Sequence, residues 1–224
     1  MERHTLRTFD REIDRLSAHI NVMGKLCEWQ LAKAVKAFSV NDKRLADEVI
    51  KADEKLNQRQ HTAEADVIQV LAKRQPVATD LRYIISIMKI ASEFERIGDY
   101  ASNISKRVIL LDTNPFPIAT GFVDDMARIG RNMINSALEA FETLDEAKAI
   151  EVWHQDDQID SKFVRFMNSL KREMGEDTAL MEAYTSFIFV GRCCERIGDH
   201  ITNIAENIYF IKTGHTYLSD SLGD

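Results

Sequence analysis

The sequence has little of the residues that punctuate β-rich and disulfide-rich folds. Among 224 residues there are only 9 Gly, 3 Pro and 3 Cys. So few Gly and Pro exclude the many tight turns that an all-β fold requires. An odd number of cysteines, with Cys193 and Cys194 adjacent, forms no disulfide framework. We therefore expect a helical protein that works in a reducing compartment.

Long hydrophobic runs are also missing from the chain. No stretch reaches the roughly 18 uninterrupted apolar residues that a membrane span needs, and no apolar run of a signal peptide follows Met1. Lys and Arg number 29 against 36 Asp and Glu, so the net charge is −7. This acidic balance disfavours nucleic acid or an anionic membrane as a partner. These features predict a cytoplasmic protein that neither enters the membrane nor binds nucleic acid.

What the sequence does have is an internal duplication. Residues 95–108 read ERIGDYASNISKRV and residues 195–208 read ERIGDHITNIAENI, with seven of 14 positions identical. Upstream, a weaker similarity at an offset of 103 pairs Asp53 with Asp156. The change of offset places a three-residue length difference between the two similar blocks, where a loop tolerates it. A period of about 100 residues is too long for a solenoid, so the chain consists of two related halves.

Apolar residues in both halves recur at alternating steps of three and four, which is typical of the buried face of an α-helix. In the first half they are Ile87, Ile90, Phe94, Ile97, Ala101, Ile104 and Val108, and in the second Phe187, Val190, Cys194, Ile197, Ile201, Ile204 and Ile208. Similar stripes predict a middle helix in each half, preceded by a first helix near residues 5–38 or 121–142.

Breaks between these helices are expected at Asn41–Asp42, Pro76, Asp145 and residues 175–177. Short breaks between long helices favour antiparallel neighbours. The predicted fold is therefore all-α, with two tandem three-helix bundles. We expect the first bundle over residues 1–112, a linker over 113–120, the second bundle over 121–214 and a tail over 215–224.

The most informative polar residues are two pairs of acids inside the duplicated block. Glu95 and Asp99 are four residues apart, and a helical turn of about 100° per residue places both opposite a stripe centred on Ile97. Neighbouring anions at this spacing repel each other. The same pair occurs again as Glu195 and Asp199. An arrangement that is unfavourable alone and is present in both halves indicates a bound cation.

The middle helices offer matching oxygen donors. Asp53 and Asn57 in the first half correspond to Asp156 and Asp160 in the second, again four residues apart. Oxygen donors from two helices suit hard cations such as Mg²⁺, Ca²⁺, Mn²⁺ or iron rather than a thiolate-bound zinc. Several adjacent carboxylates can hold more than one metal ion.

Other polar residues of the block leave alternatives open. Asn103 and Asn203 could bind a ligand or cap a neighbouring helix. Arg96 and Arg196 could neutralise the carboxylates by salt bridges instead of a metal.

The segment LAKRQPVATDLR at residues 71–82, together with the two ERIGD blocks, closely resembles the PhoU family. These are regulatory accessory proteins of phosphate-specific ABC transport, and the resemblance covers nearly the whole chain. It implies two tandem three-helix bundles that bind multinuclear iron or zinc clusters through E(D)xxxD pairs. Carried over, the pairs are Glu95/Asp99, Glu195/Asp199 and Asp156/Asp160. The remaining pair departs from this pattern because Asp53 is followed by Asn57, which removes one negative charge from the first site.

The resemblance further implies a regulator without catalytic activity, which restrains phosphate uptake and represses the phosphate-starvation response. Its implied partners are the ATPase subunit of the phosphate ABC transporter and a membrane sensor histidine kinase. We also expect a homodimer, because amphipathic bundles often leave apolar surface uncovered. A helical adaptor without a metal is one alternative. A metal-dependent phosphoesterase is another, but no general base or activated nucleophile accompanies the acids.

Overall fold

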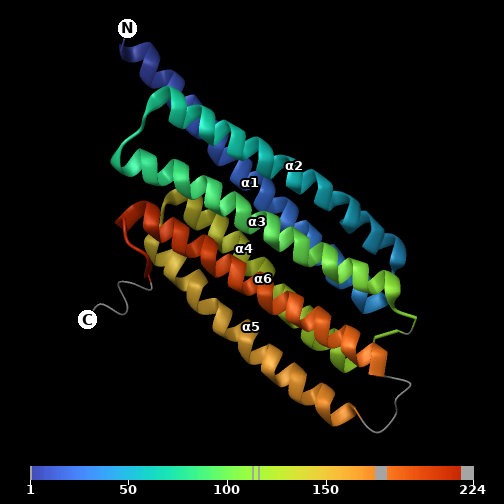
Figure 1. Ribbon diagram of the computed structural model, residues 1–224. Helices are drawn as coiled ribbons and strands as arrows, with labels where there is room; N and C mark the ends of the chain where they lie inside the picture. The colour runs from blue at the N-terminus through green and yellow to red at the C-terminus, as the bar shows by residue number, and fades with distance from the viewer. Residues whose placement is uncertain (1, 113, 116, 175–180, 218–224) are drawn as a thin grey trace.

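The computed structural model describes residues 2–112, 114–115, 117–174 and 181–217, with side chains from residue 8 onward. Its described residues form six long helices and no strand, so the predicted all-α fold is confirmed (Figure 1). The helices are α1 (Glu2–Val40), α2 (Lys43–Arg74), α3 (Ala78–Leu110), α4 (Pro117–Thr143), α5 (Glu146–Glu173) and α6 (Met181–Thr213). None of the described helices is apolar over a length that would let it cross a membrane.

The middle helix of each half begins at an aspartate, as the duplication predicts. The Asp42 carboxylate accepts a hydrogen bond from the backbone N–H of Leu45 at 3.0 Å, and Asp145 accepts one from Lys148 at 3.0 Å. An N-cap aspartate satisfies a backbone donor that the first helical turn leaves without a partner. The break after Arg74 falls next to Pro76, as predicted, whereas the predicted break at residues 175–177 lies outside the described residues.

The predicted linker is too long at its C-terminal end. Helix α4 begins at Pro117, so residues 117–120 belong to the second bundle and not to a linker over 113–120. The prolines favoured a linker in the sequence, but proline is well suited to the first position of a helix, where its missing N–H would have no partner. Helix α1 likewise extends beyond its predicted bounds, to Val40.

The two halves lie side by side along their length, with α2 and α5 on opposite outer sides (Figure 1). Helices α3 and α6 are antiparallel. Arg82 Nε donates to the carbonyl oxygen of Ile211 at 3.3 Å, and Arg107 lies 4.5 Å from the Phe189 ring centroid at the other end. Because residue numbers rise along α3 as they fall along α6, the two ERIGD blocks meet near the middle of this helix pair.

Helices α1 and α4 form the second antiparallel contact between the halves. Arg131 pairs with Glu28 at 2.6 Å, and the Ser39 hydroxyl donates to Asp124 at 2.8 Å. Buried apolar side chains from all six helices then form one continuous cluster. The two bundles therefore share a single core, and each half depends on the other for part of its burial.

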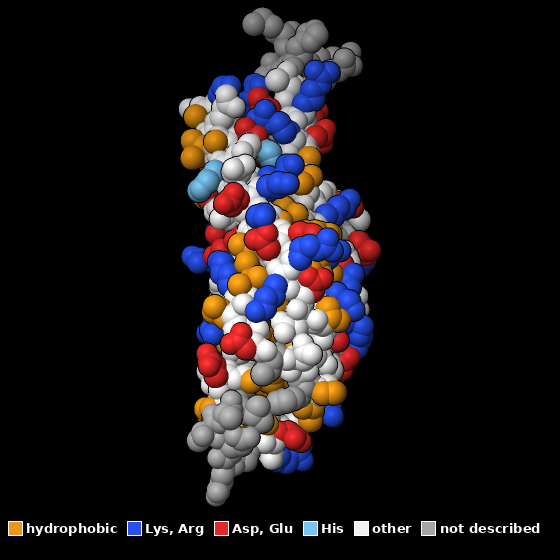
Figure 2. Space-filling model, turned by 90° about the vertical axis from the view of Figure 1, so that its right-hand side faces the viewer, with side chains coloured by type: hydrophobic (Ala, Val, Ile, Leu, Met, Phe, Trp, Pro, Cys, Tyr) orange, Lys and Arg blue, Asp and Glu red, His pale blue; other side chains and the backbone are white. Residues whose placement is uncertain are grey.

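The surface mixes charges of both signs. Figure 2 shows Lys and Arg side chains interspersed with Asp and Glu over the side of the molecule that faces the viewer, with apolar side chains scattered between them. The excess of acid is therefore not concentrated on this face. Interspersed charge of this kind keeps a protein soluble and does not by itself indicate a binding site.

Candidate functional site

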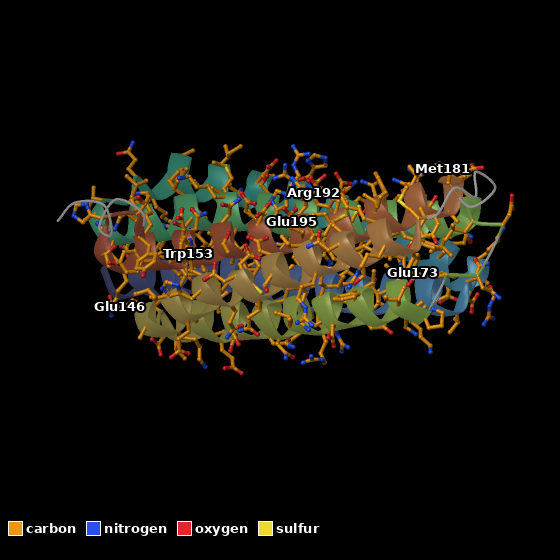
Figure 3. The ribbon with its side chains drawn as sticks, turned by 90° about the horizontal axis from the view of Figure 1, so that it is seen from below. Glu146, Trp153, Glu173, Met181, Arg192 and Glu195 are labelled. Carbon is orange, nitrogen blue, oxygen red and sulfur yellow. The ribbon has the colours of Figure 1, made fainter. Side chains whose placement is uncertain are left out.

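The acids of the second half meet where α5 packs on α6. Asp156 and Asp160 of α5 interact electrostatically with Glu195 and Asp199 of α6. Asp156 Oδ1 and Glu195 Oε2 are buried and accept no hydrogen bond. Figure 3 shows Glu195 beside Arg192, above the middle of α5. Anionic oxygens without a partner are costly to bury, so this group is short of positive charge.

The pKa values of these acids reflect the same shortage of positive charge. Burial first, and then the charges of Asp160, Asp199 and Glu195, raises the pKa of Asp156 to about 7. Burial and the charge of Asp199 also raise the pKa values of Asp160 and Glu195. Desolvation and like charges both disfavour ionised carboxylates. A cation bound between these carboxylates would offset both the desolvation and the repulsion between like charges.

Arginines neutralise part of this group. Arg196 donates to Asp199 at 3.0 Å and lies 4.0 Å from Glu195, and Arg192 forms an ion pair with Glu195. The alternative of salt bridges is therefore realised for the two acids of α6, and in the first half Arg96 lies 3.9 Å from Glu95. Neither arginine is paired with Asp156, so the most buried acid of the group remains uncompensated.

The first half builds a similar but less acidic site between α2 and α3. Asp53 is only 8% exposed, and Asp53 Oδ1 and Asn57 Oδ1 are buried without a hydrogen-bond partner. Burial and the nearby Asp99 raise the pKa of Asp53, while burial, Asp99 and Asp53 raise that of Glu95. Since Asn57 carries no charge, this site holds three acids where the second half holds four.

One residue of the first site was missed in the sequence. Gln30 of α1 is fully buried, and neither atom of its amide group makes a hydrogen bond of ordinary geometry. It lies beside Gly98 and Asp53, and together with Ser102 it partly offsets the rise in the pKa of Asp53. Its counterpart at the offset of 103 is Met133. A comparison of the two first helices would have shown this polar residue.

The glycines of the two ERIGD blocks allow the outer helices to approach. A Cβ atom on Gly98 would lie 2.2 Å from Leu56 Cδ2 and 3.2 Å from Asp53 Oδ1. A Cβ atom on Gly198 would lie 2.0 Å from Asp156 Oδ1. The contacts with Leu56 and with Asp156 are too close for any other residue without displacement of these side chains. Gly98 therefore makes room for Leu56 of α2, and Gly198 makes room for Asp156 of α5.

The prediction that the ERIGD acids lie opposite the core is wrong for the two glutamates, whereas the side chain of Asp199 is 38% exposed. The side chain of Glu95 is 19% exposed and that of Glu195 is 12% exposed. The estimate assumed one buried stripe, but α3 packs on α1, α2 and α6, and α6 packs on α3, α4 and α5. A helix with three neighbours buries more than one face, so these acids lie at a helix–helix junction.

The two asparagines of the block form hydrogen bonds with other side chains. Asn203 Nδ2 donates to Glu93 of α3 at 3.2 Å, and His200 Nδ1 lies 2.7 Å from the same carboxylate oxygen. Asn103 accepts from Lys106 at 3.5 Å. Asn203 thus joins the two halves.

The acids are near one another but are not assembled. Among the residues that the structure describes, no three Asp, Glu, His or Cys side chains converge closely enough to form a ready-made metal site. Carboxylates without a cation turn apart because they repel each other. The chemistry of the donors still fits a hard cation, because carboxylate and amide oxygens line each site and five of them, with that of Gln30, are buried without a hydrogen-bond partner.

The fold and the acids together define a duplicated six-helix protein with two related oxygen-donor sites, one on each side of the α3–α6 pair. The model of the PhoU domain matches residues 20–108 and again residues 123–208. The chain belongs to the PhoU family. The two matches coincide with the two halves that the duplication defines.

Relatives and solved structures extend over nearly the whole chain. The "Phosphate-specific transport system accessory protein PhoU homolog" of Caulobacter vibrioides is 35% identical over 98% of this chain and 96% of its own length. The homolog of Pseudomonas putida is 37% identical over 94% and 83%. The crystal structure of PhoU from Pseudomonas aeruginosa matches with a TM-score of 0.88 and 34% identity, over 92% of this chain and all of that one. PhoU from Streptococcus pneumoniae gives 0.86 and 30%, over 93% and 98%.

Proposed function

We propose that this protein is a cytoplasmic, metal-binding regulator that restrains phosphate uptake and represses the phosphate-starvation response. The observation that carries the proposal is the match of both halves to the PhoU domain, in a chain whose relatives are phosphate transport accessory proteins. The duplicated acids and their unpartnered oxygens support the metal-binding part. The proposed role involves binding to other proteins, not catalysis.

The proposed metal ligands are Asp156, Asp160, Glu195 and Asp199 in the second half, and Asp53, Asn57, Glu95 and Asp99 in the first. A bound cation supplies the positive charge that the buried oxygens of Asp156, Glu195 and Asp53 lack. The side chains hold it between an outer helix and a central helix, and thereby fix the distance between the two. We further propose that the resulting faces bind the transporter's ATPase subunit and the sensor histidine kinase.

The proposal is tested with the purified, untagged protein and the ATPase subunit of its own organism's phosphate transporter. We expect binding when the protein is loaded with Mn²⁺ and much weaker binding after treatment with a chelator. Replacing Glu195 and Asp199 by Gln and Asn is expected to weaken binding in the presence of Mn²⁺. Equal binding by all these forms would contradict a metal-dependent regulator.

A second test concerns the regulatory direction. A strain that lacks the protein is expected to take up more phosphate and to express starvation genes in phosphate-rich medium. Uptake that is unchanged or reduced in this strain would contradict a restraining role. The proposed homodimer is checked separately by light scattering of the full chain.

A helical adaptor without a metal is the second candidate. It is favoured by the observation that no three ligating side chains converge among the described residues. The two candidates differ in metal content. Metal analysis of protein purified without chelators should find bound metal in the chain, and none in a variant that lacks both acid pairs, if the first candidate is correct.

A further inference from the structure

A basic hollow lies away from the acidic sites, between α4 and α5, toward the Glu173 end of α5 labelled in Figure 3. Its volume is about 620 Å³. Phe122 of α4 lines one side, and the α5 residues that line it are Arg165, Asn168, Ser169, Lys171 and Arg172. Three of these six residues are cations and none is an acid, which is unusual in a chain whose net charge is −7.

The three cations are not neutralised by the described part of the chain. No ion pair within it involves Arg165, Lys171 or Arg172. The one hydrogen bond of this group is from Arg172 Nη2 to Ser169 Oγ, at 3.4 Å. Three positive charges in one hollow repel each other. They are therefore placed where an anion would stabilise them.

The first half provides an internal comparison for this place in the fold. At the offset of 103, Ser169 and Phe122 correspond to Asp66 and His19. There Asp66 pairs with His19 at 2.9 Å and with Arg15 at 2.8 Å, so an acid of the chain itself neutralises Arg15. In the second half Ser169 replaces the acid, while Ile118 and Phe122 replace Arg15 and His19.

Three neighbouring positions of α5 have instead become cationic. Arg165 stands where the first half has Thr62, Lys171 where it has Ile68, and Arg172 where it has Gln69. At this place in the fold the second half has thus lost the ion pair of the first half and gained three positive charges that no acid of the described residues pairs with.

From this comparison we infer that the hollow binds a small phosphoryl oxyanion, either free phosphate or linked phosphates. The guanidinium groups of Arg165 and Arg172 offer paired N–H donors whose spacing matches two oxygens of a phosphoryl group. Lys171 adds a third positive charge, and Ser169 and Asn168 add neutral hydrogen-bonding groups. The volume admits a single phosphate as well as a short chain of phosphates.

The test is a calorimetric titration of the full chain, freed of metal, with inorganic phosphate and with inorganic tripolyphosphate. Saturable binding of either probe supports the inference, and the tighter probe identifies the source of the phosphoryl group. Replacing Arg165 and Arg172 by Gln is expected to weaken binding at least about tenfold, since each charge-assisted contact contributes more than a neutral one. The inference would be overturned if neither inorganic phosphate nor tripolyphosphate bound.

A matched control removes the same charge elsewhere. Lys55 and Arg59 line a separate hollow on α2, so the variant with both replaced by Gln has the same net charge as the variant at Arg165 and Arg172. We expect it to bind the probes as the unchanged chain does. An equal loss of binding in both variants would show that the probes respond only to net charge, and would contradict a site.

A third variant restores the acid that the first half has at this position. Ser169→Asp places a carboxylate among the three cations, where Asp66 stands in the other half. We expect this variant to remain folded, as measured by circular dichroism, and to lose binding of both probes. Retained binding in a folded Ser169→Asp variant would overturn the inference, whatever the arginine variants show.

Discussion

The first and second halves of the chain share one helical plan but differ in the polar groups placed on it. Fully or nearly fully buried apolar positions coincide along the duplication, as in Phe38 and Phe141, which are 0% and 2% exposed. The acids of the ERIGD blocks coincide as well, but other polar positions do not, because Asn57 corresponds to Asp160 and Gln30 to Met133. The core and the block acids were therefore kept, while the polar groups around them changed. The second acidic site is the more highly charged of the two.

The strongest test of this comparison removes one acid pair at a time. Replacing Glu195 and Asp199 by Gln and Asn is expected to weaken Mn²⁺ binding by about 100-fold or more, because two charged ligands are lost. The same change at Glu95 and Asp99 should have a smaller effect on total affinity. Mn²⁺ titrations followed by electron paramagnetic resonance measure both. Equal losses would show that the extra charge of Asp160 does not matter.

Replacing Gly98 or Gly198 by alanine should have different effects on the stability of the protein and on its Mn²⁺ affinity. In Gly98→Ala the new Cβ meets the fully buried Leu56, and we expect a loss of about 1 to 3 kcal/mol in the free energy of unfolding. In Gly198→Ala it meets Asp156, so the change should mainly reduce Mn²⁺ affinity. Urea unfolding and Mn²⁺ titration of both variants check this. The reverse pattern would contradict the assigned neighbours.

The pH dependence of the metal-free protein should come largely from the second half. The pKa of Asp156 is raised from 3.8 to about 7, so its stabilising contribution is complete below about pH 4 and is lost as the pH rises through 7. At about pH 8 we expect the free energy of unfolding of Asp156→Asn to exceed that of the unchanged chain by about 1 to 3 kcal/mol. At about pH 4 we expect little difference between the two. Denaturation in the presence of a chelator tests this, and Asp53→Asn, at the corresponding position, is the control. If Asp53→Asn changed the free energy of unfolding more than Asp156→Asn, the first half and not the second would dominate the pH dependence.

Exchanging the residue types at positions 57 and 160 should reverse the order of the Mn²⁺ affinities of the two sites. Asn57→Asp adds a carboxylate to the first site, and Asp160→Asn removes one from the second. We expect each change to shift the Mn²⁺ affinity of its own site by about tenfold, which corresponds to about 1.4 kcal/mol. Titration of the two single variants and the double variant measures the shifts. Unchanged affinities would mean that these positions do not contact the metal.

Most of the fold could be predicted because it depends on repeated patterns. Apolar periodicity and the duplication predicted six helices, and aspartates mark the starts of α2 and α5 at Asp42 and Asp145. The start of α4 at Pro117 was missed because proline is common both in linkers and at first helical positions. The sharing of one core by both halves depends on contacts distant in sequence, which periodicity does not show.

The acidic site could be predicted only in outline. The spacing of Glu195 and Asp199, and of Asp156 and Asp160, follows from the sequence, and the structure brings the two pairs to one helix junction. Their burial could not be predicted, because it depends on how many helices surround α6. Gln30 was missed because a lone glutamine in an amphipathic helix belongs to no motif.

The central claim is that cations hold together acids that otherwise repel each other. It is tested most directly by a crystal of the protein grown with Mn²⁺, with diffraction measured at the manganese absorption edge. We predict an anomalous peak between α5 and α6 within bonding distance of Asp156 and Glu195, and a weaker peak between α2 and α3. Carboxylates that remain apart in such a crystal, with no peak at either junction, would contradict the account.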